Sequence, residues 1–397
     1  MTTSTTPSPN RLPRTVWAVG LVSLFMDISS ETIHALLPLF LTTKLGASVA
    51  IVGIIDGVAE STAAIGKVFS GYISDRIGKR KPLILFGYGL AAISKPLFAL
   101  ATSPAYVLGA RFADRVGKGF RGAPRDALIA DVTPNAMRGR AYGLRQALDT
   151  VGAFVGPLLA IGLMALFNDN MRAVFWVAII PAAISVALVL FGVEDRQGSE
   201  KARAPIHFRD LSSLPPHFWL LMVIAVTFTF ARFSEGFLIL KANADGLPVM
   251  FAPLVLVVMN IVYAGGAYPV GALADRMRPR TLLFAGIGTL IAADLALALM
   301  PGLAGAFLGI ALWGAHLALT QGVFAKLVAD AAPENLRASA FGIFNLLTGV
   351  ALLIASVIAG FAWDRMGANA TFLIGAGFAA FAAATALVAR ARRRAQQ

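Results

Sequence analysis

The chain has 397 residues, of which 57% are apolar and only 14% are charged, with a formal net charge of +13 and a mean hydropathy of +0.74. Soluble domains carry about 25% charged residues, so this chain lacks the polar surface that a soluble globule needs. The composition excludes a disordered chain, a secreted disulfide scaffold and an ordinary cytosolic enzyme, and it favours a protein with many membrane spans. The absence of cysteine excludes disulfide bonds, thiol catalysis and thiolate metal sites.

The predicted elements begin with residues 1–14, a segment rich in Thr, Ser and Pro that lacks the basic and apolar regions of a signal peptide. A series of apolar stretches follows, most of them long enough to cross about 30 Å of hydrocarbon. The twelve predicted spans are 15–41, 49–71, 82–101, 105–117, 141–166, 173–193, 217–240, 249–272, 281–299, 304–325, 338–362 and 370–389. The fourth is the shortest and the most heavily charged.

The positive-inside rule orients these spans. The loops on the side of both termini hold 24 Lys and Arg residues, whereas the opposite loops hold four, so we expect both termini in the cytoplasm and the chain in the inner (plasma) membrane. This distribution also accounts for the positive net charge. Nucleic-acid binding is disfavoured, because each basic group is short and the next lies beyond a membrane span.

The chain repeats itself at an offset near 200. Gly71-Tyr-Ile-Ser-Asp75-Arg76 matches Gly271-Ala-Leu-Ala-Asp275-Arg276, and a second pair of motifs beginning at Asp131 and Asp330 matches at offset 199. Each half holds six spans, which predicts two parallel repeats around a central cleft. The predicted domains are a tail (1–14), a six-helix bundle (15–193), a cytoplasmic linker (194–216), a second six-helix bundle (217–390) and a basic tail (391–397).

The segment Gly71-Tyr-Ile-Ser-Asp75-Arg76-Ile-Gly78-Lys79-Arg80-Lys81 resembles the loop signature of the major facilitator superfamily between its second and third spans. The resemblance extends over nearly the whole chain and implies an all-α membrane protein of twelve helices. We expect Gly71, Asp75 and Arg76 to form a conformational latch, with Arg76 holding Asp126 or Asp114. The alternative is that Lys79–Lys81 serve only as positive charges in a tight turn that orient the spans in the membrane.

In the fifth span, Gly152-x-x-x-Gly156-Pro157 resembles the antiporter motif of the same superfamily and most closely suggests its drug/proton antiporters. Glycines four residues apart let two helices approach closely, and the proline adds a kink. We assign Gly152, Gly156 and Pro157 to the conformational latch. Leu158, Leu159 and Ala160 follow where the family carries further glycines, and simple helix packing is the alternative.

The first span is the most informative, because ionisable groups inside a membrane are costly and mark function. Asp27, Glu31 and His34 lie at i, i+4 and i+7 and therefore share one helix face. Burial and like charge disfavour ionisation of both acids, which suits a proton carrier. We expect Asp27, and after it Glu31, to carry the proton. Permanent neutralisation by Arg111 or another base is the alternative.

Further candidates for the substrate cavity come from other spans, and Arg232 and Glu235 of the seventh span, at i and i+3, are close enough to pair. The cavity candidates are His34, Asp56, Glu60, Arg111, Arg232, Glu235, His316 and Gln321. His34 and His316 with Asp27 could hold a divalent metal, but a lone histidine within a membrane is more often a packing residue. We therefore predict no metal site.

No nucleotide-binding motif and no sizeable soluble segment is present, so the chain is predicted to be no enzyme and to need no cofactor. The sequence predicts a proton-coupled secondary transporter that exports a small organic molecule by alternating access. Its predicted partners are substrate, protons and the lipid bilayer, and a monomer suffices to carry the whole cleft. Proton-linked uptake of a metabolite, or transport of a divalent metal or its chelate, is the alternative.

Overall fold

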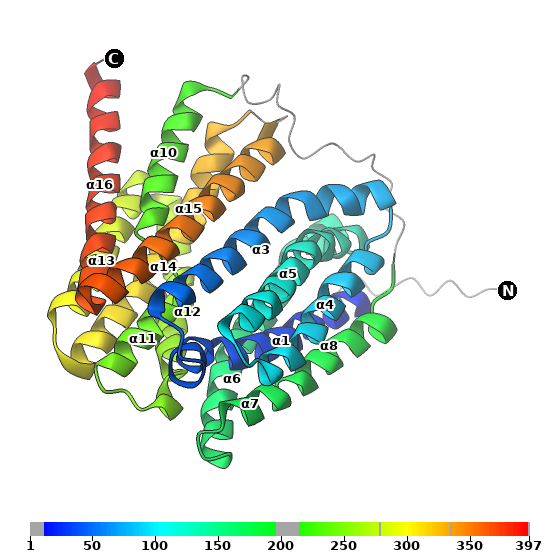
Figure 1. The fold of residues 1–397 in the computed structure, drawn as a ribbon. Helices are drawn as coiled ribbons and strands as arrows, with labels where there is room; N and C mark the ends of the chain where they lie inside the picture. Colours follow the sequence, from blue (N-terminus) through cyan, green and yellow to red (C-terminus); the bar gives the residue numbers. More distant parts are fainter. Residues whose placement is uncertain (1–11, 196–213, 278, 334–335, 396–397) are drawn as a thin grey trace.

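The computed structural model describes residues 12–195, 214–277, 279–333 and 336–395, and these parts are helical throughout, without a β-strand (Figure 1). Most of the predicted linker 194–216 and most of the tail 1–14 lie outside the described residues. The last helix continues to Ala395, into the predicted C-terminal tail that begins at residue 391.

The first half forms six membrane crossings, two of which are built from consecutive helical pieces. Its elements are α1 (Arg14–His34), α2 (Leu37–Leu39) and the π-helical turn η1 (Phe40–Lys44), α3 (Val49–Ile77), α4 (Lys81–Leu100), α5 (Pro104–Val132), η2 (Asn135–Met137), α6 (Arg138–Leu166), α7 (Met171–Val177) and α8 (Ile179–Gly192). Pro38 stands at the start of α2. A proline there removes a backbone donor, which fits the end of α1 a few residues earlier.

The second half repeats this order. Its elements are α10 (Pro216–Phe230), α11 (Gly236–Ala244), η3 (Val249–Phe251), α12 (Leu254–Arg276), α13 (Pro279–Leu299), α14 (Gly302–Ala331), α15 (Arg337–Met366) and α16 (Ala368–Ala395). Among the residues described, ten helical stretches are long and apolar enough to span a membrane. The charged α5 and the interrupted pair α10–α11 complete the twelve crossings, so the predicted fold class is confirmed.

Two predicted spans differ from the structure for physical reasons. The fourth was predicted as 105–117, whereas α5 runs from Pro104 to Val132. Its charges do not end the helix because they find partners on neighbouring helices, which hydropathy cannot register. The seventh was predicted as one helix over 217–240, but residues 231–235 are not helical and separate α10 from α11.

The two halves meet mainly where α3 crosses α15 and where α6 lies beside α12 (Figure 1). Glycines bring the first pair into backbone contact: a β-carbon on Gly53 would lie 2.2 Å from the carbonyl oxygen of Ser356. One on Gly360 would lie 2.7 Å from Cα of Ala50. No side chain separates the helices at these points.

We call the end of the molecule at the turns 45–48 and 245–248 the closed end. Here the α15 side chain of Asp364 accepts hydrogen bonds from the backbone N–H groups of Val49 and Ala50, at 3.0 and 2.9 Å. These are otherwise unsatisfied donors at the start of α3. One half of the chain thus caps a helix of the other half and joins the bundles at this end.

Candidate functional site

A cavity of about 1220 Å³ lies between the two bundles. Its lining comes from the halves of the helices that point away from the closed end, such as Glu60–Lys67 of α3 and Lys118–Arg125 of α5. Both bundles contribute to the wall. The cavity therefore belongs to a state in which one end is shut and the other gives access to the space between the bundles, which we call the open end.

The predicted face of α1 borders this cavity at Asp27 and Glu31. Glu31 lies 3.5 Å from Nδ1 of His34. Asp27 is half-buried and has no ion pair with any described residue. The charges that act on it electrostatically come from three helices: Lys118 and Arg121 on α5, Asp149 on α6, and Glu31 on α1.

The glycines of α6 pack directly against this face. A β-carbon on Gly152 would lie 2.9 Å from Cβ of Asp27, and one on Gly156 would lie 2.8 Å from Cβ of Glu31. Thr32 of α1 also donates a hydrogen bond to the carbonyl oxygen of Gly156 at 3.0 Å. The two motif glycines are thus spaced to receive the two acids, and both glycines and Pro157 are buried between the helices.

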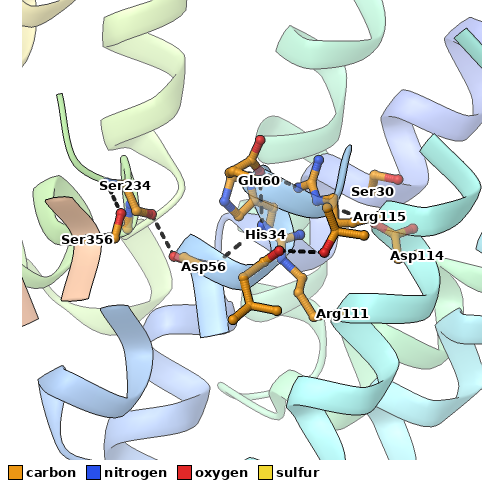
Figure 2. Close-up of polar contacts among 12 residues, drawn as sticks. Ser30, His34, Asp56, Glu60, Arg111, Asp114, Arg115, Ser234 and Ser356 are labelled. Atoms are coloured by element: carbon orange, nitrogen blue, oxygen red, sulfur yellow. Dashed lines mark hydrogen bonds and ion pairs between the residues drawn. The ribbon is translucent and has the colours of Figure 1, made fainter. Parts of the chain in front are cut away.

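Behind the cavity wall, α3 and α5 carry a buried charge network (Figure 2). Arg115 Nη2 lies 3.2 Å from Oε1 of Glu60, and Arg111 Nη2 lies 3.6 Å from Oδ1 of Asp56 and 3.9 Å from Glu60. Neutralisation by Arg111 was the alternative to a proton role for the acids of α1, but the carboxylate partners of Arg111 are the two acids of α3. Its Nε and Nη2 atoms make no hydrogen bond, so Nη2 is held near these acids by charge.

A second pair in the same region joins α4 to α5. Lys95 Nζ lies 2.7 Å from Oδ1 of Asp114 and donates a hydrogen bond to Ser30 Oγ of α1 at 2.9 Å. Lys95 is 1% exposed and Asp114 is 3% exposed. Three helices of the first bundle are held together by this one ammonium group.

The other oxygen of Asp56 reaches the second bundle (Figure 2). Ser234 donates its hydroxyl hydrogen to Oδ2 of Asp56 at 2.6 Å, and its N–H group donates to Ser356 Oγ at 3.2 Å. Ser234 lies in the break between α10 and α11 and accepts from the N–H group of Gly236. Asp56 is therefore buried between Arg111 of its own bundle and Ser234 of the other, and it does not line the cavity.

The break also explains why Arg232 and Glu235 do not pair. The prediction assumed helical spacing, but both residues lie outside the helices, and no ion pair forms between them. Arg232 lines the cavity and lies over the ring of Phe228 at 5.9 Å, while Glu235 lies outside the lining. Gln321 does line the cavity, where its Oε1 accepts from Tyr263 at 2.7 Å.

The two histidines do not come together at the cavity. His34 pairs with Glu31 behind the wall, and His316 is fully buried against Trp313 and Phe228 with neither ring nitrogen hydrogen-bonded. Within the described ranges no group of three or more His, Asp or Glu side chains is placed to hold a metal ion. The metal alternative has no support here.

The latch expected around Arg76 takes another form. Gly71 packs against Ala123 of α5, as expected for a close approach, but Arg76 is exposed and pairs with neither Asp126 nor Asp114. The side chain of Asp75 lies outside the described residues. Arg80 instead joins the loop to α5, with its Nε 3.2 Å from Oδ2 of Asp131.

Asp126 itself belongs to a cluster between α5 and α6. Arg145 lies 2.7 Å from Asp149 and 3.8 Å from Asp126, and Arg125 lies 3.2 Å from Asp126 and donates to Ser23 Oγ at 2.8 Å. This cluster ties the open-end halves of α5 and α6 to α1. Asp126 and its partners therefore form a contact within the first bundle.

Several residues at the site escaped the sequence analysis. They are Lys67, Lys118, Ser234, Ser356 and Asp364. Lys67 was counted among the bases within a span without a role, and Lys118 was counted as loop charge near the inner face. The serines and Asp364 act through contacts between distant helices. A lysine two turns beyond Glu60 on the same helix was the only available signal, and it pointed to Lys67.

Two six-crossing bundles around a central cavity that carries ionisable groups define a membrane transporter. The chain belongs to the Major Facilitator Superfamily, whose family profile matches residues 19–355. The predicted family is therefore confirmed, and the chain is a transporter, not an enzyme.

Two relatives illustrate the range of similarity. An uncharacterised MFS-type transporter of Methanocaldococcus jannaschii is 31% identical over 371 residues, which cover 92% of each chain. The multidrug resistance protein MdtL of Escherichia coli is 25% identical over 341 residues, covering 82% of this chain and 84% of MdtL. Among solved structures, a POT family transporter shares the fold with a TM-score of 0.81 at 12% identity, over 96% of both chains.

Proposed function

We propose that this protein is a proton-coupled secondary active transporter that moves a small organic molecule by alternating access. The observation that carries the proposal is the placement of Asp27. Asp27 has no ion pair with a described residue and lies on the wall of the cavity between the bundles. It packs against Gly152 so closely that α1 and α6 would have to move for its position to change. An intramembrane acid of this kind is a default candidate for a proton relay.

In alternating access, the contacts that shut one end of the cavity would break while contacts that shut the other end form. At the closed end, Asp364 of α15 accepts a hydrogen bond from the start of α3, and Ser234 of the second bundle donates one to Asp56 of the first. Both contacts join the two bundles. Opening this end requires both contacts to break. Glu31 is the second candidate for proton transfer, because it lines the same cavity and its charge is shared with His34.

Export is the first candidate direction. It is supported by the resemblance of Gly152-x-x-x-Gly156-Pro157 to the antiporter motif, by the packing of that motif on the two acids, and by the similarity to a multidrug resistance protein. A proton and a cationic or polar substrate would then compete for Asp27. The distribution of basic residues supports an orientation with the open end and both termini in the cytoplasm, in the inner (plasma) membrane.

Proton-linked uptake is the second candidate, and one specific observation favours it. Lys67 and Lys118 line the cavity without any carboxylate partner. Such a pair attracts an anion, and an anion binds more readily when Asp27 is neutral, so proton and substrate would enter together. In both directions one chain forms the whole cavity, and we propose that the transporter acts as a monomer.

The deciding experiment uses purified protein in liposomes that contain a pH-sensitive dye. A proton gradient is imposed, and panels of lipophilic cations, sugars and organic acids are added. We expect one class to change the proton flux, and we expect Asp27→Asn to abolish that change. Asp169→Asn is the matched control, because Asp169 lies in the turn after α6 with φ 62°, a conformation that asparagine tolerates, and outside the cavity.

Substrate transport that is unaltered in Asp27→Asn overturns the proton assignment. The direction follows from the sign of the flux: protons that leave the compartment gaining substrate indicate antiport, and protons that enter with the substrate indicate cotransport.

A further inference from the structure

Among the described charged residues that line the cavity, the bases without an ion pair outnumber the acids without one. Three of its four acids are matched by a base: Glu31 by His34, Glu60 by Arg115 and Asp149 by Arg145, each at 2.7 to 3.5 Å. These three bases lie behind the wall, since none of them lines the cavity. Only Asp27 remains as an unpaired acid among the described lining residues.

The bases of the wall are matched less completely. Lys67 and Lys118 are exposed to the cavity, and neither lies within 4.0 Å of a described carboxylate. On the opposite wall, Arg232 has the ring of Phe228 beneath it but no ion pair. Arg121 lies over the Tyr88 ring at 4.6 Å, and its buried Nη1 has no hydrogen-bond partner.

Lys67 and Lys118 flank a close contact between α3 and α5. A β-carbon on Gly119 would lie 3.0 Å from Cα of Gly66, so α3 and α5 are in backbone contact at this point. Lys67 and Lys118 are the immediate chain neighbours of these glycines and both face the cavity. Two ammonium groups on neighbouring helices of one cavity wall, neither with a described carboxylate within 4.0 Å, attract an anion to this wall.

The opposite wall offers an apolar surface. Phe228 and Phe324 have ring centroids 5.4 Å apart, and Phe324 and Phe344 have centroids 6.3 Å apart. All three rings border the cavity beside Arg232, but Phe228 is 1% and Phe324 is 6% exposed, so these two rings support the wall from behind. The apolar lining that is partly open to the cavity is Phe344 and Leu352 of α15 and Phe154 of α6. Such a surface takes an apolar or aromatic body, whereas a sugar-like molecule would need hydrogen-bonding groups in its place.

We propose that the cavity binds an organic anion with an apolar body, held by Lys67 and Lys118 at its anionic group and by Phe154, Phe344 and Leu352 at its body. The inference rests on the proposed transport function and names the substrate class of the same cavity. Lysine ammonium groups act as point charges, so a carboxylate and a phosphate monoester satisfy the same chemistry. The apolar body distinguishes the substrate from an inorganic anion.

Asp27 couples this site to the proton. Its charged neighbours are Lys118 and Arg121 from α5, Asp149 from α6 and Glu31 from its own helix. An ionised Asp27 competes with the substrate for Lys118, whereas a protonated Asp27 leaves that ammonium group free. Proton and anion therefore bind cooperatively, and for a substrate of this class the linkage supports the second candidate direction, proton-linked uptake.

The test measures binding to the full chain in lipid nanodiscs with ligands that share a body and differ in charge. Naphthoate, naphthamide and naphthylmethylammonium form one such triplet, and phenyl and octyl triplets vary the body. We expect at least one carboxylate to bind tenfold or more tightly than its amide and its ammonium counterpart. Naphthyl phosphate separates a phosphate preference from a carboxylate preference.

Variants assign the binding to the two lysines. Lys118→Gln and Lys67→Gln should each weaken anion binding about tenfold, whereas Lys118→Arg should retain it and shows that a charge, not a fold defect, is at issue. Lys44→Gln is the matched control, because Lys44 is exposed at the closed end outside the cavity. A preference for the ammonium ligands, no carboxylate that binds better than its amide, or wild-type affinity in both lysine variants overturns the proposal.

The pH dependence separates this inference from the proposed function. We expect anion affinity to fall on raising the pH from 6 to 8 in the wild type and to stay constant in Asp27→Asn. Anion binding that depends on the lysines without any proton flux in liposomes would refute the proton coupling and leave the anion site standing. Proton flux driven by lipophilic cations alone would refute the anion site and leave the coupling standing.

Discussion

Gly152 of α6 lies directly against Asp27 of α1, and a β-carbon at this glycine would fall 2.9 Å from Cβ of the acid and 2.8 Å from the carbonyl oxygen of Leu24. The second contact is with backbone, which cannot rotate away. The position of the proton candidate relative to the cavity is therefore fixed by a residue without a side chain.

Gly152→Ala should push α6 away from α1 and displace Asp27, because the added methyl group meets the carbonyl oxygen of Leu24 at 2.8 Å and Cβ of Asp27 at 2.9 Å. We expect a loss of at least tenfold in the initial rate of transport and a lowered melting temperature in detergent. The control is Gly162→Ala on the same helix, where nothing lies within 4 Å of the added carbon. That variant should be neutral or slightly more stable, since alanine is the better helix former. Equal behaviour of the two variants would contradict the packing argument.

Lys95→Met should destabilise the first bundle strongly, because it leaves the Asp114 carboxylate buried without its partner at 2.7 Å. Removing one member of a buried ion pair costs about 3–5 kcal/mol, whereas replacing both by apolar residues is often close to neutral. The double variant Lys95→Met/Asp114→Leu should therefore recover much of the lost free energy of unfolding. Chemical unfolding in detergent, carried out as a double-mutant cycle, measures this recovery. Simple addition of the two single effects would show that the pair is not coupled.

Asp364→Ala should loosen the closed end, because it removes the acceptor for the backbone donors of Val49 and Ala50 across the bundle interface. Losing a cap of this kind costs about 1 kcal/mol, enough to shift the balance between two conformations several-fold. Spin labels at Lys44 and Ala244, which lie on different bundles at this end, should report a larger population of long distances. The chain has no cysteine, so two introduced cysteines carry the labels without background. Glu194→Gln, an exposed acid near the opposite end, should leave the distances unchanged.

Much of the fold followed from local patterns. Hydropathy found twelve crossings, and the offset of 200 residues found the two halves, because both signals reside in the sequence of single segments. The i, i+4 spacing of Asp27 and Glu31 placed both acids at the cavity for the same reason.

What the sequence could not supply depends on pairs of distant segments. The length of α5 was underestimated because Lys118, Arg121 and Arg125 look like loop residues until the Tyr88 ring is placed beside Arg121 and Ser23 beside Arg125. The break after Phe230 follows from the contact of Ser234 with another bundle, which no local pattern encodes. Charges with partners and charges without them look alike in a sequence, and for this reason Lys67 and Lys118 were not singled out.

The backbone contact of α3 with α15 has a consequence for energy conservation. A β-carbon on Gly53 would lie 2.2 Å from the carbonyl oxygen of Ser356, and one on Gly360 would lie 2.7 Å from Cα of Ala50, so the two helices are in backbone contact and leave no room for a water molecule between them there. Protons move along chains of water, and under the proposed proton coupling a leak between the bundles would discharge the gradient that drives transport. Larger residues at Gly53 and Gly360 would hold the helices apart, and we expect them to make the membrane leak protons.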